Sequence, residues 1–173
     1  MSLPGRRKLV ELDYSLSQRM QLAKRPGKLR SLAALFAHSG DSWFWLAGLG
    51  LLWLLARGSW RELAAIMAAA LVFTAVLVLS IKFTVRRQRP EGQWGSIYRK
   101  TDPHSFPSGH AARASLLAVL AFGIGPIWSG VLLLIWAPLV SLARVAMGVH
   151  YLSDVVAGVL LGASVGVLIL MLL

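Results

Sequence analysis

Residues 63–83 read LAAIMAAALVFTAVLVLSIKF, an apolar stretch whose first charged residue is Lys82, next to its end. About 20 apolar residues in a helix, at a rise of 1.5 Å per residue, match the roughly 30 Å hydrocarbon core of a bilayer. The stretch therefore predicts a helix that crosses a membrane. It also raises the question of why a lysine stands at the end of the span.

Further apolar blocks follow the same pattern along the chain. The 173 residues are 57% hydrophobic with a mean hydropathy of +0.66, and this hydrophobic share exceeds that of ordinary soluble domains. In addition to Leu63–Phe83, we predict spans over Trp43–Ala56, His110–Ile124, Trp128–Met147 and Tyr151–Leu173. The first of these is short, and we expect it to extend back toward Leu32 with a kink at Gly40. The predicted fold class is an all-α integral membrane bundle of about five spanning helices.

Residues 1–31 are polar and basic, and leucines recur among them at roughly helical spacing. We predict an N-terminal amphipathic helix on the membrane surface, with a disordered basic tail as the alternative. The first residues contain no apolar core, so they are not a cleavable signal peptide. We divide the chain into this basic segment, 1–31, and a membrane domain, 32–173.

The net charge of +11 and the pI near 11.3 are values that nucleic-acid-binding proteins share. Here the basic residues flank hydrophobic blocks and accompany no nucleic-acid motif, so we exclude nucleic acid and predict the lipid bilayer as the partner. The chain has no cysteine, which excludes disulfides, thiol catalysis and thiolate metal sites. The oligomeric state stays open.

From residue 114 to the C-terminus, only Arg144 and Asp154 carry a formal charge. Ionisable groups at membrane depth are costly and are usually kept for function. His150 lies between them, four residues before Asp154, and an aspartate one helical turn away can hold a histidine in one tautomer. Gly148 offers the turn between the last two spans. The alternative is a structural Arg144–Asp154 pair that joins two helices.

Two more polar clusters precede these residues. In KFTVRRQRP, residues 82–90, Lys82 and Arg89 are cations suited to a phosphate, or alternatively anchors to lipid headgroups. In PSGH, residues 107–110, Ser108 and the Gly109 backbone start a helix whose N-terminus suits an oxyanion, and His110 suits a general acid. The alternative for PSGH is an ordinary capped helix start.

Helix direction brings the three clusters to one membrane face, because the second span ends at Lys82, the third begins at His110, and the last two meet between Arg144 and His150. Their combined residues suit phosphoryl transfer without a metal. The carboxylates are too few for a magnesium or calcium site, and we expect no cofactor. Asp102, in the loop between the clusters, is interpreted as a turn residue.

The pattern resembles the type 2 phosphatidic acid phosphatase superfamily, whose motifs read K-x6-RP, PSGH and SR-x5-H-x3-D. Lys82 with Arg89 and Pro90 matches the first motif, and residues 107–110 match the second. The third motif matches at Arg144, His150 and Asp154, but Ala143 stands where serine is usual. The matched core covers residues 82–154. The loss of one hydroxyl is expected to tune the site rather than inactivate it.

The resemblance implies a helical-bundle membrane lipid phosphatase. It implies that His150 attacks phosphorus and forms a phosphohistidine, that Asp154 orients His150, and that His110 protonates the leaving group. The residues expected to hold the phosphate oxygens are Lys82, Arg89, Ser108, Gly109 and Arg144.

The implied substrates are lipid phosphates: phosphatidic acid, phosphatidylglycerol phosphate, and polyprenyl phosphates, diphosphates or phosphoryl sugar phosphates. A non-catalytic lipid-phosphate binding or transport protein is the alternative, and it would lack the nucleophile or the acid. We expect a multi-pass protein of the cell (inner) membrane. The excess of basic residues before the first span and at Arg99 and Lys100 favours a cytoplasmic active face, with a periplasmic face as the alternative.

Overall fold

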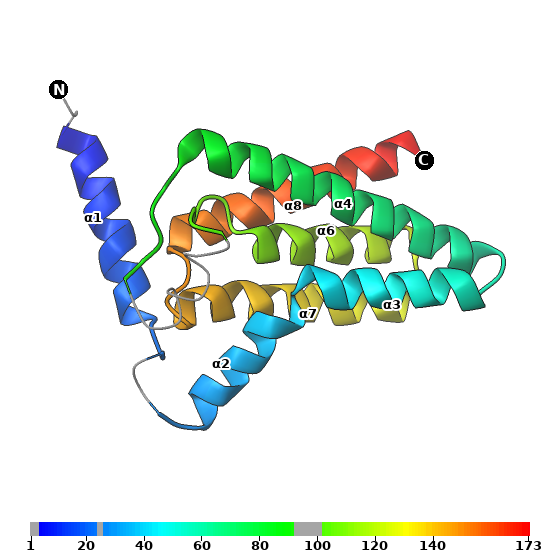
Figure 1. Ribbon diagram of the computed structural model, residues 1–173, viewed down its shortest axis with the longest axis horizontal. Helices are drawn as coiled ribbons and strands as arrows, with labels where there is room; N and C mark the ends of the chain where they lie inside the picture. The colour runs from blue at the N-terminus through cyan, green and yellow to red at the C-terminus, as the bar shows by residue number, and fades with distance from the viewer. Residues whose placement is uncertain (1–3, 24–25, 92–101) are drawn as a thin grey trace.

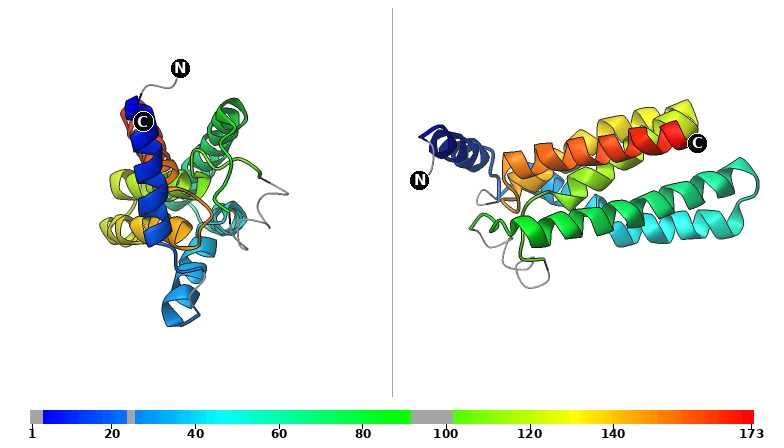
Figure 2. Two further views of the ribbon diagram at one scale, coloured as in Figure 1. Left: turned by 90° about the vertical axis from the view of Figure 1, so that its left-hand side faces the viewer. Right: turned by 90° about the horizontal axis from the view of Figure 1, so that it is seen from above.

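The structure is a computed structural model of the chain that describes residues 4–23, 26–91 and 102–173. Within these ranges the chain is helical, and β pairing is limited to an isolated bridge between Gln88 and His104. The described helices are α1 (Pro4–Arg19), α2 (Lys28–Ser39), α3 (Ser42–Leu55), α4 (Ser59–Val85), α6 (Gly109–Ile124), α7 (Ile127–Ala146) and α8 (Leu152–Leu172). Helices α3, α4, α6, α7 and α8 run side by side as a bundle (Figures 1 and 2).

Three of these helices, α4, α7 and α8, are long and apolar enough to cross a membrane. Helices α3 and α6 are also apolar, but with 14 and 16 residues they reach only about 21 and 24 Å at 1.5 Å per residue. The prediction of an all-α membrane bundle is confirmed at this level, while the count of five spans stays a prediction. The predicted spans agree with the five bundle helices to within a few residues at each end.

The backward extension of the first span is interrupted at Gly40, where a kink was predicted, and the interruption is a complete break. The chain interrupts the helix at Gly40 and Asp41, so that α2 is a separate helix set at an oblique angle to α3 (Figure 1). There is little room for a side chain at Gly40, because a Cβ there would lie 2.8 Å from Val140 Cγ1 and 3.2 Å from the His110 ring. The break brings Asp41 against the start of α6.

Helix α6 lies between α4, α7 and α8, and a row of glycines on α8 sets the closest of these packings. Gly158, Gly162 and Gly166 recur every four residues on the face of α8 that meets α6. A Cβ at Gly158 would meet the Ser108 carbonyl oxygen, and one at Gly162 would meet the Ala112 carbonyl oxygen. Small residues at this spacing let two helix backbones approach closely. The packing places the start of α8 beside the start of α6.

Helix α1 crosses the end of the bundle where α8 begins (Figures 1 and 2). Ser17 Oγ accepts the Leu152 N–H at 2.9 Å, and Asp13 Oδ1 accepts the Ser153 N–H at 2.9 Å. Both N–H groups belong to the first turn of α8, which has no partner for them inside the helix. Helix α1 therefore caps α8 through its polar side chains, while Leu9 and neighbouring apolar residues of α1 stay exposed.

Candidate active site

The three polar clusters meet at one end of the bundle, where α4 ends, α6 begins and α7 turns into α8 (Figure 1). A cavity of about 360 Å³ opens there. The polar and glycine residues that line it are Ser42, Lys82, Asp102, Gly109, His110, Arg113, Arg144 and His150. Segments separated by more than sixty positions, 82 and 150, thus contribute to one cavity.

His150 is buried and lies in the turn between α7 and α8, rather than on a helix shared with Asp154. Arg89 Nη1 lies 3.1 Å from His150 Nε2, and Asp154 Oδ2 lies 3.6 Å from His150 Nδ1. Because arginine only donates hydrogen bonds, Nε2 is the acceptor and Nδ1 carries the proton in this arrangement. Burial, followed by the charges of Arg89 and Arg144, lowers the pKa of His150 well below its ordinary value. The ring is therefore neutral at neutral pH, and the lone pair on Nε2 faces Arg89 Nη1.

Asp154 is fixed from two sides. Its Oδ2 accepts the Tyr151 N–H at 2.9 Å, and its Oδ1 accepts Arg87 Nη1 at 2.7 Å. Gly148 has a φ of +66°, in the left-handed region that favours glycine, and it lies in the turn between α7 and α8 as expected. The turn and the cap together hold the His150 ring over the cavity.

Arg144 is buried at the end of α7, and its Nη1 donates to the Ala37 carbonyl oxygen at 3.2 Å. Ala143, which replaces the usual serine, belongs to a buried apolar cluster with Ala37, Met147 and Val149. The surroundings of Ala143 are therefore apolar, in keeping with a side chain that has no hydroxyl.

Asp102 contacts both cations of the first motif. Its Oδ2 accepts from Lys82 Nζ and, at 2.8 Å, from Arg89 Nη2. Burial alone would raise the pKa of Asp102, but the hydrogen bond from Lys82 and the charges of Lys82 and Arg89 hold it below its ordinary value. The interpretation of Asp102 as a turn residue was wrong: a carboxylate bridges the two cations that were expected to hold a phosphate.

His110 contacts charged groups on both sides of its ring. Asp41 Oδ1 lies 2.6 Å from His110 Nε2, and Arg113 Nη2 lies 3.4 Å from His110 Nδ1. A carboxylate accepts and a guanidinium donates, so the proton of the neutral ring is on Nε2. Sequence reasoning missed Asp41 and Arg113. The signal for Arg113 was a lone charge one turn into an apolar helix, and Asp41 carried no spacing pattern.

The second motif starts α6. Ser108 is fully buried at the N-cap position, where its Oγ accepts the Ala111 N–H at 3.5 Å and its N–H donates to the Asp154 carbonyl oxygen at 2.9 Å. Ser108 does not line the cavity described above, whereas Gly109 does. The structure thus places the Ser108 hydroxyl in the helix cap and the first residue of α6 at the cavity wall.

Comparison with known proteins agrees with this geometry. Residues 60–173 match the model of the PAP2 superfamily. The chain is 37% identical over 163 residues to the decaprenylphosphoryl-5-phosphoribose phosphatase of Mycobacterium tuberculosis, covering 92% of this chain and 88% of that protein. It is 32% identical over 143 residues to the undecaprenyl-diphosphatase of Sulfolobus acidocaldarius, covering 81% and 68%.

Among solved structures, the fold matches a transmembrane PAP2 type phosphatidylglycerolphosphate phosphatase from Bacillus subtilis. The TM-score is 0.76 at 23% sequence identity, and the match covers 94% of this chain and 84% of that one. The chain belongs to the PAP2 superfamily. It is a membrane lipid phosphatase, as the resemblance of its three motifs predicted.

Proposed function

We propose that this phosphatase removes a terminal phosphate from a polyprenyl-linked lipid by a two-step phosphohistidine mechanism that needs no metal. The observation that carries the proposal is the pair of histidines, His110 and His150, in one cavity, each with a carboxylate at one ring nitrogen. The names of the two curated relatives, both phosphatases of polyprenyl compounds, favour this lipid class.

In the first step, His150 Nε2 attacks phosphorus and the bond from phosphorus to the leaving oxygen breaks. His110, which enters this step as the doubly protonated ring, gives that oxygen the proton of its Nδ1 and becomes the neutral ring with its proton on Nε2. Asp154 stabilises the charge that His150 gains. In the second step, water attacks the phosphohistidine and gives its proton to His110, the P–N bond breaks, and inorganic phosphate leaves.

Cations and N–H groups hold the phosphate oxygens in both steps. We assign this role to Lys82, Arg144 and the Gly109 backbone N–H, which line the cavity, and to Arg89, whose Nη1 lies beside His150 Nε2. Ser108 caps α6 and keeps the Gly109 N–H in place. Fixed donors aimed at developing negative charge supply a large part of the rate in such sites. The Asp102 carboxylate lies between Lys82 and Arg89, so it competes with a phosphate for these two cations.

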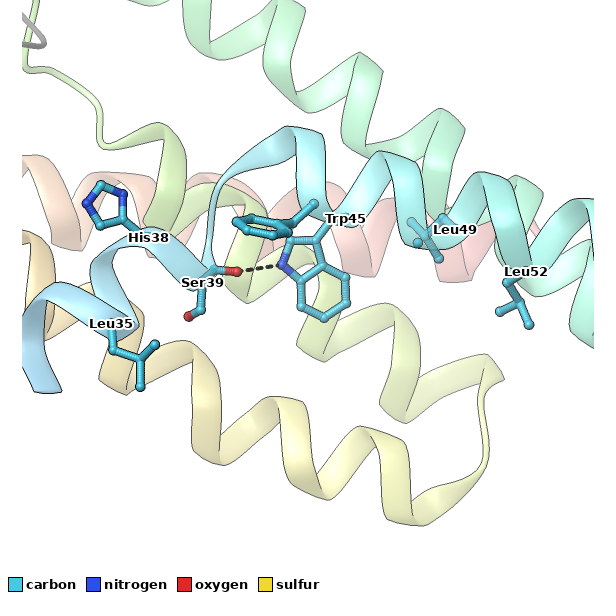
Figure 3. Close-up of a pocket in the computed structure, with 8 residues that line it drawn as sticks. Leu35, His38, Ser39, Trp45, Leu49 and Leu52 are labelled. Atoms are coloured by element: carbon cyan, nitrogen blue, oxygen red, sulfur yellow. Dashed lines mark hydrogen bonds between the residues drawn. The ribbon is translucent and has the colours of Figure 1, made fainter.

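We place the lipid chain in an apolar hollow of about 620 Å³ (Figure 3). It is lined by residues of α2 and α3 that include Leu35, Trp45, Leu49 and Leu52. The Trp45 indole N–H donates to the Ser39 carbonyl oxygen at 3.0 Å and closes one side (Figure 3). Asp41, which contacts His110, follows Ser39 by two residues, so the hollow begins near the cavity.

The orientation that we propose is a cytoplasmic active face, with five spans and with residues 1–31 at the membrane surface. Described basic residues at that end of the bundle include Arg7, Lys8 and Arg19, whereas the α3–α4 turn at the other end carries Arg57 and Arg61. Arg99 and Lys100, which entered the same argument, lie outside the described residues. Positive residues favour the cytoplasmic side. Protease cleavage of the N-terminal segment from outside intact spheroplasts would reverse this assignment.

The test of the function is phosphate release from a polyprenyl phosphate in detergent and EDTA. We expect turnover by the wild type, and none by His150→Ala at an unchanged thermal unfolding midpoint. Full activity of His150→Ala would contradict the mechanism. Tight binding of the lipid without turnover by the wild type would favour a binding or transport protein instead.

A further inference from the structure

Arg113 is a cation at the cavity that the mechanism above does not use. It lies on α6, three residues after His110, and lines the cavity with it. Its Nη1 lies close to Gly109, since a Cβ atom added to that glycine would be 3.0 Å from Arg113 Nη1. Arg113 is therefore placed to act on whatever occupies the cavity beside the start of α6.

The contacts of His110 define the side of the cavity to which Arg113 belongs. Asp41 holds His110 Nε2 at 2.6 Å, so Nδ1 is the nitrogen left to meet the leaving oxygen. Arg113 Nη2 lies 3.4 Å from this same Nδ1. In an in-line displacement, the leaving oxygen is opposite the attacking His150. Arg113 thus lies beside the leaving group, whereas Arg89 lies beside the nucleophile.

The side chain of Arg113 runs back toward the start of α6. Its Cα lies about 6 Å deeper in the bundle than that of Gly109, at 1.5 Å per residue, whereas its Nη1 lies beside Gly109. The lipid chain of a substrate must leave the cavity toward the membrane interior. Arg113 therefore reaches the cavity from the side toward which the chain leaves.

The guanidinium of Arg113 also lacks a full set of partners. Its Nε is buried without a hydrogen-bond partner, and within the described ranges none of the ion pairs includes Arg113. A cation at this depth is costly unless an anion accompanies it. Asp41, the acidic residue nearest to the ring of His110, is already engaged by that ring.

We propose that Arg113 binds a second phosphate, located in the leaving group, and thereby selects lipids that carry two phosphates. The inference rests on the proposed function and adds to it the class of substrate. The second phosphate has two possible sources: a diphosphate, where it is joined directly to the scissile phosphate, or a phosphodiester on the far side of a sugar. The 3.4 Å separation between Arg113 and the acid favours the directly joined diphosphate.

The experiment compares phosphate release from three lipids with the same polyprenyl chain: the monophosphate, the diphosphate and the phosphoryl sugar phosphate. The full-length protein is assayed in detergent as wild type, Arg113→Gln, Arg113→Lys and Arg61→Gln. Arg61 is a matched control, because its guanidinium lies over the Trp53 ring, at 4.4 Å, at the opposite end of the bundle.

We expect wild-type kcat/KM to be higher for the diphosphate than for the monophosphate. In Arg113→Gln this ratio should fall about 10- to 100-fold, the value of a hydrogen bond between charged groups, while Arg113→Lys keeps most of it and Arg61→Gln keeps all of it. A fall in the ratio for the phosphoryl sugar phosphate alone would identify the phosphodiester as the ligand.

Equal losses on all three lipids in Arg113→Gln, or no loss, would overturn the inference and leave the proposed function standing. A wild type that releases phosphate from none of them would contradict the proposed function itself. If Arg113→Gln does not fold, the wild-type preference and the Arg113→Lys ratio still decide. A wild type without preference for two phosphates contradicts the role of Arg113.

Discussion

Asp41 and Asp102 are acidic residues that no motif of the family contains, yet both contact motif residues. Asp41 meets the acid His110 on the side away from Arg113, and Asp102 bridges Lys82 and Arg89. Both carboxylates come from segments between helices, α2–α3 for Asp41 and α4–α6 for Asp102. The motifs therefore contain the residues that we assign to phosphate binding and catalysis. The two loops add the carboxylates: Asp41 orients His110, and Asp102 lies between Lys82 and Arg89.

Asp41→Asn should lower kcat about tenfold to a hundredfold on a lipid phosphate, because the carboxylate stabilises the doubly protonated ring of His110 that protonates the leaving oxygen. An aryl phosphate, whose leaving group needs little protonation, should be slowed much less. The comparison of kcat for the two substrates is the measurement. His38→Gln is the control, because exposed His38 contacts the other oxygen of Asp41 at 3.4 Å. Equal losses on both substrates would argue against acid positioning.

Asp102→Asn should strengthen inhibition by inorganic phosphate or vanadate roughly three- to tenfold, because a neutral amide competes poorly for two cations. The lowered pKa of Asp102 keeps its carboxylate charged, and so in competition with phosphate, at neutral pH. The inhibition constant of each anion is the measurement, and Glu91→Gln, at an exposed acid of the same loop, is the control. An unchanged or weaker inhibition would show that Asp102 does not occupy the phosphate position.

At the scale of the elements, the packing of α8 against α6 positions the nucleophile beside the oxyanion site. The close approach of the two backbones requires the row of glycines, because a Cβ at Gly158 or Gly162 would collide with carbonyl oxygens of the facing segment. Ser115 Oγ donates to the Val159 carbonyl oxygen at 3.0 Å and secures the same contact in the middle of the helices.

Gly162→Leu should destabilise the protein by about 1–3 kcal/mol or more, because its side chain would collide with the backbone of α6 at Ala112. Activity should fall as well, since α8 carries Asp154 and follows His150. Thermal unfolding in detergent together with phosphate release tests this expectation. Gly50→Leu on α3 is the matched control, because a Cβ at Gly50 meets nothing within 4 Å. The same loss in both variants would contradict the packing role.

At the scale of the whole molecule, α1 connects the N-terminal segment to the active-site end. Arg87 donates to Asp13 Oδ2 and to Asp154 Oδ1, each at 2.7 Å, and its guanidinium lies 4.1 Å from the centre of the Tyr151 ring. Asp13, which caps α8, is therefore linked through Arg87 to Asp154, the carboxylate beside His150.

Asp13→Ala should release α1 from the bundle at a cost of about 1–3 kcal/mol, since it removes a carboxylate that accepts three hydrogen bonds. Trypsin cleavage near Arg19 should become faster, and phosphate release slower. Burial alone would raise the pKa of Asp13, but the hydrogen bonds from Arg87 and Ser153 hold it below its ordinary value. Its contribution is thus complete at neutral pH and is lost as the pH falls through that lowered pKa.

The control for this prediction is Glu11→Ala, at an exposed acid on the same helix. Unchanged cleavage in Asp13→Ala, or equal acceleration in both variants, would contradict the docking of α1 through Asp13.

The sequence by itself determined the helical class, the approximate ends of the bundle helices and the family, because apolar runs and motif spacings are local properties of the chain. It also indicated which end of each helix would carry polar residues. At Gly40 it predicted a kink, whereas the structure has a complete break, after which α2 and α3 are separate helices at an oblique angle.

Only the tertiary structure decided which groups surround the motif residues. Asp41 and Asp102 acquire their chemistry from contacts with residues that lie on other elements, and no spacing within the chain encodes such contacts. Arg113 lies on the same helix as His110, but only the structure shows that its guanidinium faces the cavity. The same holds for His150, which reaches Asp154 from a turn rather than along a shared helix. The physical reason is that the glycine row of α8 and the break at Gly40 set distances between backbones, and those distances select the partners of each charge.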